Sequence, residues 1–134
     1  MPSTPPEEVD VPFQPNRGWV KRFAVACRGI KIAVRGEASF FVHLFVTAMA
    51  VLAGVIFGIS RREWCLIILC ISIVLCAELL NTSLERLARA ISREENPDIR
   101  DALDIASGAV LVVSIAAAIV GLLVFGIRAA HMLT

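Results

Sequence analysis

Three long apolar runs dominate the pattern of hydrophobic and polar positions along the chain. Residues 39–59 and 105–127 contain no acidic residue, lysine or arginine. Residues 64–84 form another run, with Glu78 and Asn81 inside its second half. Because an α-helix rises 1.5 Å per residue, about 20 residues cross a hydrocarbon core about 30 Å thick. The pattern therefore predicts three membrane-spanning helices over these residues.

A shorter segment, residues 18–36, has the pattern of an amphipathic helix. Trp19 and Phe23 fall close to one face. Three basic residues recur every seventh position and so share the other face: Lys21, Arg28 and Arg35. A basic amphipathic helix beside a membrane span is expected to lie in the membrane interface with its apolar side down. The alternative is a helix that packs on a soluble partner.

The lysine and arginine residues outside the apolar runs predict the orientation in the membrane. Residues 60–63 are expected to form a turn, and residues 85–100 a charged connection that is broken at Asn96-Pro97. With three spans, ten of the 13 lysine and arginine residues fall on the side of the N-terminus. Since these residues accumulate in cytoplasmic segments, the N-terminus is predicted to be cytoplasmic and the C-terminus external.

The composition agrees with an all-α integral membrane protein of one domain. The 134 residues are 57% apolar and 19% charged, with a mean hydropathy of +0.77, whereas soluble domains are about 45–50% apolar and about 25% charged. A formal net charge of +1 gives no reason to expect nucleic acid as a partner. The four cysteines form no Cys-x-x-Cys pair, which predicts free thiols. Residues 1–17 hold five of the six prolines and are predicted to form a disordered cytoplasmic tail.

Small residues in the first and last apolar runs predict close contacts between helices. Gly54 and Gly58 form a G-x-x-x-G motif, which lets helices approach closely in lipid. The last run carries a second set of small residues: Ser107, Gly108, Ser114, Ala117, Ala118 and Gly121. Three short spans enclose little volume, so a sizeable site is expected to need several copies of the chain.

Glu78, Asn81 and Glu85 form a polar stripe at the end of the second apolar run. At 100° per residue, the three positions fall within about 60° of one another on a helix. A charged residue inside the hydrocarbon costs about 2.5–3.5 kcal/mol, so an intramembrane carboxylate indicates a functional site. Glu85 alone also fits an interfacial charge that reaches the membrane surface.

Further carboxylates are expected at the same cytoplasmic interface. Glu37 stands just before the first run and Asp104 just before the last, although Glu37 also fits an ordinary interfacial charge and Asp104 a helix N-terminus. Carboxylate oxygens suit Mg²⁺ bound together with substrate phosphates, and a deeper glutamate can take the proton of a hydroxyl. This arrangement would serve phosphoryl transfer from a soluble nucleotide to a lipid alcohol. His43, inside the first run, is expected to have a packing or hydrogen-bonding role.

The same residues carry a resemblance to a known family. The strongest piece is Glu78-Leu-Leu-Asn81-Thr-Ser-Leu-Glu85, which follows the pattern E-x-x-N-[ST]-[AS]-[IL]-E, and a second block is Asp104-Ile-Ala-Ser107-Gly-Ala-Val-Leu. Shorter pieces also match: Arg28-Gly29-Ile30, Glu37 with Phe40, His43-Leu44 and Arg62-Glu63-Trp64. From about Phe23 to Phe125, the chain resembles the small prokaryotic diacylglycerol kinases and undecaprenol kinases.

The resemblance implies a surface helix and three transmembrane helices, assembled as a homotrimer in the bacterial inner membrane. Residues 18–134 would form a lipid kinase domain that acts with ATP and Mg²⁺ on a membrane lipid alcohol, diacylglycerol or undecaprenol. Glu78 would be the general base toward the lipid hydroxyl, Glu37 and Glu85 would hold the metal on ATP, and Asn81 would help order the site. The remaining expected contacts are Asp104, Arg100 and Arg28 with the nucleotide, and Ser107 with the lipid.

Two positions depart from the family pattern. The family usually has a phosphate-binding lysine where this chain has Leu103, and often an aspartate where it has Arg89. Because the transferred phosphates need positive charge nearby, Arg100 or Arg89 is expected to replace the lysine. The alternative is that both arginines serve only the orientation in the membrane.

The missing lysine also leaves open a second class of function, a membrane assembly protein that retains the kinase fold without turnover. A proton-conducting oligomer would explain an intramembrane glutamate, but it would not explain why the carboxylates gather at one interface. Within the kinase hypothesis, the pieces His43-Leu44 and Arg62-Glu63-Trp64 resemble the undecaprenol-type members more closely.

Overall fold

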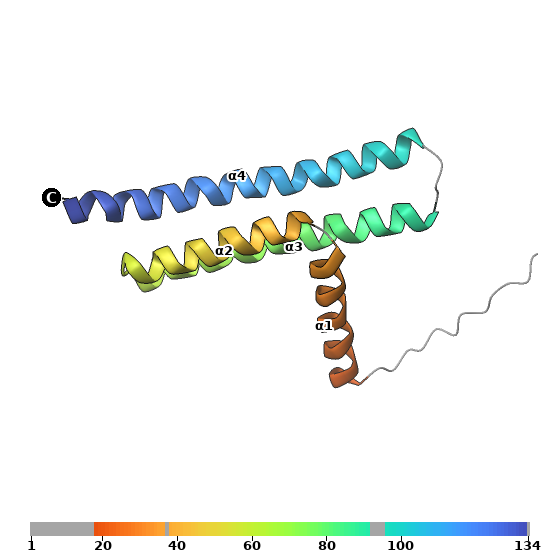
Figure 1. The fold of residues 1–134 in the computed structure, drawn as a ribbon, viewed down its shortest axis with the longest axis horizontal. Helices are drawn as coiled ribbons and strands as arrows, with labels where there is room; N and C mark the ends of the chain where they lie inside the picture. The colour runs from red at the N-terminus through yellow and green to blue at the C-terminus, as the bar shows by residue number, and fades with distance from the viewer. Residues whose placement is uncertain (1–17, 37, 92–95, 134) are drawn as a thin grey trace, which may run out of the picture.

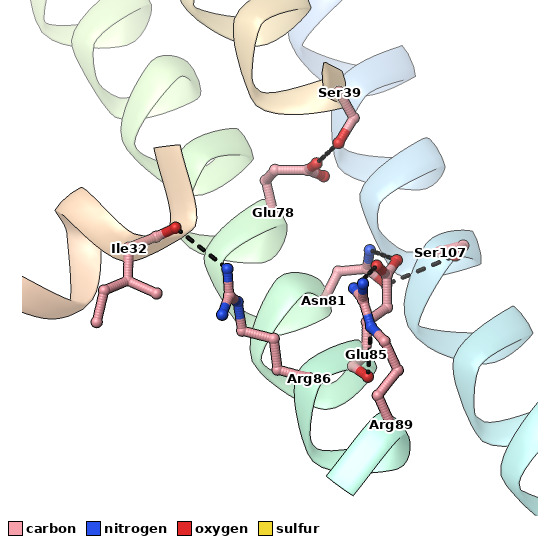
Figure 2. Close-up of polar contacts among 8 residues, drawn as sticks. All are labelled: Ile32, Ser39, Glu78, Asn81, Glu85, Arg86, Arg89 and Ser107. Carbon is pink, nitrogen blue, oxygen red and sulfur yellow. Dashed lines mark hydrogen bonds and ion pairs between the residues drawn. The ribbon is translucent and has the colours of Figure 1, made fainter. Parts of the chain in front are cut away.

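The computed structural model describes residues 18–36, 38–91 and 96–133. These residues form four helices: α1 (Trp19–Gly36), α2 (Ala38–Ile56), α3 (Arg61–Ile91) and α4 (Pro97–Leu133). Helices α3 and α4 pack against each other along much of their length, and α2 lies against α3 (Figure 1). Helix α1 stands across the direction of the other three and meets them at the start of α2 (Figure 1), close to the polar stripe of α3 (Figure 2).

Helices α2, α3 and α4 are each long and apolar enough to cross a membrane, with mean hydropathies of 2.2, 2.3 and 2.9 over their most apolar stretches. They coincide with the three predicted runs. In a single chain, at most 22% of the residues in such a stretch are buried. Most apolar side chains therefore face outward, which fits an integral membrane protein whose helices are covered by lipid or by other helices.

Helix α2 ends three residues before the predicted end of its span, at a glycine cap. Gly58 has a φ of +58°. The Ile59 N–H donates to the Gly54 carbonyl (3.2 Å) and the Gly58 N–H to the Val55 carbonyl (3.3 Å), which is the bond pattern of a Schellman motif. Gly58 thus ends the helix, and within one chain nothing lies within 4 Å of a Cβ atom built on it.

Gly54 has the close-packing role that the sequence suggested. A Cβ atom built on Gly54 would lie 2.8 Å from Cη2 of Trp64 and 3.1 Å from Cδ1 of Ile59. Any side chain at Gly54 would therefore collide with the Trp64 ring, which packs against the small core of Ile59, Ile67 and Val124. This glycine allows α2 to approach the start of α3.

The segment predicted as a turn at residues 60–63 is instead the start of α3. The Ser60 N–H donates to Oε2 of Glu63 (2.6 Å), and the Glu63 N–H donates to the Ser60 hydroxyl (3.4 Å). This reciprocal pair is a capping box, so Ser60 caps a helix that begins at Arg61. Glu63 also accepts two bonds from Arg128 of α4, at 3.2 and 2.5 Å. The ion pair fastens the end of α4 to the start of α3.

The predicted connection over residues 85–100 is also shorter than expected. Helix α3 continues to Ile91 and α4 begins at Pro97. The Asn96 side chain accepts the N–H groups of Asp98 (2.9 Å) and Ile99 (3.4 Å), so it caps α4, and Pro97 occupies the first helical position, which suits its fixed φ. The charged residues on both sides of the break are helical because a membrane-spanning helix can continue beyond the apolar run.

Helix α1 covers residues 19–36 of the segment predicted as an amphipathic helix, and near its C-terminal end it is joined to α3. Nη2 of Arg86 donates to the Ile32 carbonyl (3.4 Å), where a positive charge complements the helix dipole. A Cβ atom on Gly36 would meet the same guanidinium nitrogen at 2.3 Å. The predicted tail at residues 1–17 lies outside the described residues. The four cysteines are free thiols, as predicted.

Candidate active site

Glu78 is the most deeply buried member of the polar stripe. It lies on α3 with an exposed fraction of 2%, and two residues of α2 face its carboxylate. The Ser39 hydroxyl donates to Oε1 (Figure 2), and Nε2 of His43 lies 3.7 Å from Oε2. Each carboxylate oxygen of Glu78 therefore has its own neighbour on α2.

Asn81 connects α3 to α4 at the centre of the stripe. It is 8% exposed. Its Nδ2 donates to Oε1 of Glu85 (2.9 Å), and its Oδ1 accepts a longer bond from the Ser107 hydroxyl (3.5 Å) (Figure 2). A buried carboxamide with a donor and an acceptor bond is nearly fixed in orientation. Asn81 therefore restricts the orientation of Glu85 through this bond.

Glu85 lies one turn farther along α3 and is half-buried. Nη2 of Arg89 lies 3.3 Å from its Oε2, and Nε of Arg89 donates to its backbone carbonyl (3.3 Å). The carboxylate thus has a hydrogen-bond donor on one oxygen and a cation on the other. The spacing of four residues places Arg89 on the same helix face.

The stripe is divided into two groups with different partners. Glu78 interacts with α2, whereas Asn81 and Glu85 interact with α4 and with Arg89 (Figure 2). Glu78 and Glu85 are seven positions apart, which corresponds to about 10 Å along the helix axis. The site therefore has a buried carboxylate at one depth and a partly exposed one at another.

Across the described ranges, no group of three or more histidine, cysteine, aspartate or glutamate side chains could hold a metal ion. Glu37, the other predicted metal ligand, lies outside these ranges. Glu85 and the Asn81 carbonyl oxygen still fit Mg²⁺ in kind, because this ion binds through one or two carboxylates together with substrate phosphates and water.

The predicted nucleotide-binding residues are not brought to the stripe by contacts within one chain. Arg28 on α1 and Arg100 and Asp104 on α4 are exposed, and no side-chain bond joins them to the stripe among the residues that the structure describes. Asp104 lies one turn before Ser107 on α4. Arg89 is the arginine that reaches the stripe directly.

Sequence reasoning missed Ser39, and it assigned to His43 only a packing or hydrogen-bonding role. Both face Glu78 in the structure. Their spacing of four residues places them on one face of α2, and this polar pair on an apolar helix was the available signal. The position of α3 relative to that face was not readable from the pattern.

His43 also borders an apolar cavity between α2, α3 and α4. The cavity has a volume of about 580 Å³ and a mostly apolar lining. The predicted small residues of the last run contribute to that lining: Ser114, Ala117, Ala118 and Gly121. Because these side chains are short, they leave open space between the helices, and His43 is the lining residue that also lies beside Glu78.

Comparisons with known proteins cover the residues of the site. The family described as prokaryotic diacylglycerol kinase matches residues 24–125, which include all three members of the stripe. The chain is also 35% identical over 107 residues to undecaprenol kinase of Bacillus subtilis (strain 168). That alignment covers 80% of this chain and 87% of the other protein. The chain therefore belongs to the prokaryotic diacylglycerol kinase family.

Proposed function

We propose that this protein is an ATP-dependent lipid kinase that phosphorylates the hydroxyl group of undecaprenol in the bacterial inner membrane. The observation that carries the proposal is the buried carboxylate of Glu78, placed beside a second, partly exposed carboxylate group on a membrane-spanning helix. Family membership and the similarity to an undecaprenol kinase support the same reaction. The non-catalytic alternative has no support from these comparisons.

In this reaction the lipid hydroxyl oxygen forms a bond to the γ-phosphorus of ATP, and the bond from that phosphorus to the β-γ bridging oxygen breaks. The hydroxyl proton passes to Glu78, and ADP leaves. The Glu78 carboxylate is on a membrane-spanning helix and is only 2% exposed, so a lipid hydroxyl placed beside it would meet a carboxylate and not water as its proton acceptor. Glu78 suits the role of general base for this reason.

Glu85 is suited to the nucleotide end of the site. Together with Glu37 it would hold the divalent ion that accompanies ATP, and this ion would neutralise phosphate charge during transfer. Asn81 keeps Glu85 in place through the 2.9 Å bond. Arg89 would supply the positive charge near the phosphates, which in this family usually comes from a lysine at the position of Leu103. We assign Asp104, Arg100 and Arg28 to the nucleotide and Ser107 to the lipid as further proposals.

Undecaprenol is favoured over diacylglycerol because of the identity to an undecaprenol kinase. The apolar cavity beside His43 offers room for the chain of a lipid whose hydroxyl lies near the Glu78 carboxylate. Both alcohols present a hydroxyl on an apolar tail. The direct measurement is therefore the ratio of the two phosphorylated products when both alcohols are offered together.

The protein is proposed to act as a homotrimer with its N-terminus in the cytoplasm and α1 in the membrane interface. The exposure of most apolar side chains of α2, α3 and α4 leaves ample surface for helix contacts between copies. The ten-to-three distribution of lysine and arginine supports the orientation. In a cysteine-free background, Arg61→Cys should be labelled only from outside the cell, and Asp98→Cys only from the cytoplasm. The opposite labelling would overturn the orientation.

The reaction is tested with purified protein, labelled ATP and Mg²⁺, offering undecaprenol and diacylglycerol in separate and mixed micelles. Labelled undecaprenyl phosphate should form, and it should dominate in the mixture. Glu78→Gln should lower kcat without changing the Mg²⁺ concentration for half-maximal rate, whereas Glu85→Gln should raise that concentration.

The matched control is Asp98→Asn, which removes an exposed acidic side chain in the first turn of α4. It should leave both quantities unchanged. If folded protein phosphorylates neither alcohol, the kinase proposal is wrong and the assembly-protein alternative becomes the better one. If Glu78→Gln retains full turnover, the general-base assignment is wrong.

A further inference from the structure

Two polar side chains on α2 meet the Glu78 carboxylate, one at each oxygen. The Ser39 hydroxyl donates to Oε1, and Nε2 of His43 lies 3.7 Å from Oε2. The two residues are four positions apart, so they project from one face of α2 toward α3. Figure 2 shows Ser39 directed at the carboxylate from the neighbouring helix.

These contacts matter because Glu78 has almost no access to solvent. Its side chain is 3% exposed, and that of His43 is 20% exposed. A carboxylate in such a place has few water molecules to hold it, so protein donors must replace them. The Ser39 hydroxyl does this for Oε1. Among the residues that the structure describes, the polar neighbour of Oε2 is the His43 imidazole, 3.7 Å away and beyond hydrogen-bond distance, so Oε2 is the oxygen that can accept a bond from another proton donor.

We infer that Ser39 and His43 are positioning residues that fix the Glu78 carboxylate and direct its Oε2 toward the lipid hydroxyl. The inference rests on the proposed function and deepens it. General-base catalysis needs the base within about 2.6–3.2 Å of the hydroxyl oxygen. A free carboxylate can rotate about its terminal bond, and one held at Oε1 cannot rotate without losing that hydrogen bond.

The orientation of the general base therefore depends on two helices. Glu78 lies on α3, but its orientation is set from α2, which is held near its other end by the close contact between Gly54 and Trp64. The relative position of α2 and α3 therefore determines where Oε2 points. The serine and the histidine act through Glu78 and need not contact ATP.

The test compares pairs of variants in the undecaprenol assay. Ser39→Ala removes the donor, and Ser39→Thr restores a hydroxyl. His43→Leu removes the ring nitrogen, and His43→Gln restores a side-chain nitrogen at similar reach. Each polar-to-apolar change should lower kcat about ten- to a hundredfold, with the KM for ATP within about twofold of the parent value. Each conservative change should recover most of the lost kcat.

Ser72→Ala is the matched control. Ser72 is exposed on α3, six positions before Glu78, and its hydroxyl donates to the Ile68 carbonyl (2.8 Å), so the change removes a hydroxyl from a membrane-spanning helix without altering the Glu78 contacts. Its kcat should equal that of the parent. Thermal unfolding of every variant in detergent identifies any that fail to fold, and for those the Thr or Gln variant carries the comparison.

The inference is overturned if Ser39→Ala and His43→Leu keep parental kcat, or if their loss of rate is a change in the KM for ATP. It is also overturned if Thr and Gln fail to recover activity in folded protein. These outcomes are separate from failure of the proposed function, in which the parent protein itself transfers no phosphate to a lipid alcohol.

Discussion

Asn81→Asp exchanges one NH₂ group for an oxygen at the centre of the polar stripe and leaves the shape of the side chain unchanged. The bond from the Ser107 hydroxyl to Oδ1 (3.5 Å) can persist. The bond from Nδ2 to Oε1 of Glu85 (2.9 Å) cannot, because an ionised aspartate has no donor. Two carboxylate oxygens would then face each other at the same place, and Glu85 must turn away.

The expected loss follows from the bond that disappears. A hydrogen bond to a charged group contributes about 1.5–3 kcal/mol, and about 1.4 kcal/mol corresponds to a factor of ten. If the orientation of Glu85 matters for binding the nucleotide with its metal, kcat/KM for Mg-ATP should fall about 10- to 150-fold. Repulsion between the two carboxylates adds to this loss, and Arg89, 3.3 Å from Oε2 of Glu85, reduces it.

The assay is initial-rate kinetics with Mg-ATP varied at saturating undecaprenol. Ser83→Ala is the control, because Ser83 is exposed on the same helix and its hydroxyl donates to the backbone carbonyl of Leu80 (3.1 Å). The control should stay within about twofold of the parent. A kcat/KM for Asn81→Asp equal to that of the parent would refute the reasoning, since the structure then assigns Asn81 a bond without consequence.

Three further outcomes are expected. Arg89→Gln should raise the KM for Mg-ATP about tenfold, whereas Arg61→Gln, at the opposite end of α3, should change it less than twofold; steady-state kinetics would expose the reverse order. Gly54→Val should lower the free energy of unfolding by about 1–3 kcal/mol because its Cβ would lie 2.8 Å from the Trp64 ring, and a parental denaturation midpoint in detergent would contradict the packing. Arg128→Gln should lower the thermal midpoint slightly by breaking its ion pair, with a smaller difference at high salt; a salt-independent difference would point to packing instead.

The helices themselves were largely predictable from the sequence. An apolar run of about 20 residues can form only a helix in lipid, because each backbone N–H and C=O must find a partner within the segment. The ends were harder to predict. Hydropathy marks where a helix enters the hydrocarbon, whereas N-caps such as Ser60 and Asn96 mark where the helix begins. At α3 and α4 the start of the apolar run and the start of the helix differ by several residues.

The site was predictable only where it lies on one helix. Glu78, Asn81 and Glu85 share a face because the helical repeat requires it. The neighbours of Glu78 come from α2, an apolar helix in which Ser39, His43 and Thr47 are the polar residues. Hydropathy alone does not reveal which face of this helix meets α3. Ser39 therefore escaped notice until the packing of the two helices placed it against the carboxylate.

The unbroken length of α3 has a consequence for the membrane around the protein. Its 31 residues correspond to about 46 Å at 1.5 Å per residue, well beyond the hydrocarbon thickness of about 30 Å. Because Glu78 and Glu85 sit on this rigid rod, their separation along the membrane normal is set by the helix and not by the bilayer. The depth at which a lipid carries its hydroxyl, by contrast, moves with bilayer thickness. Activity in vesicles should therefore pass through an optimum as acyl chains are lengthened, where the headgroup plane coincides with the fixed position of the buried carboxylate.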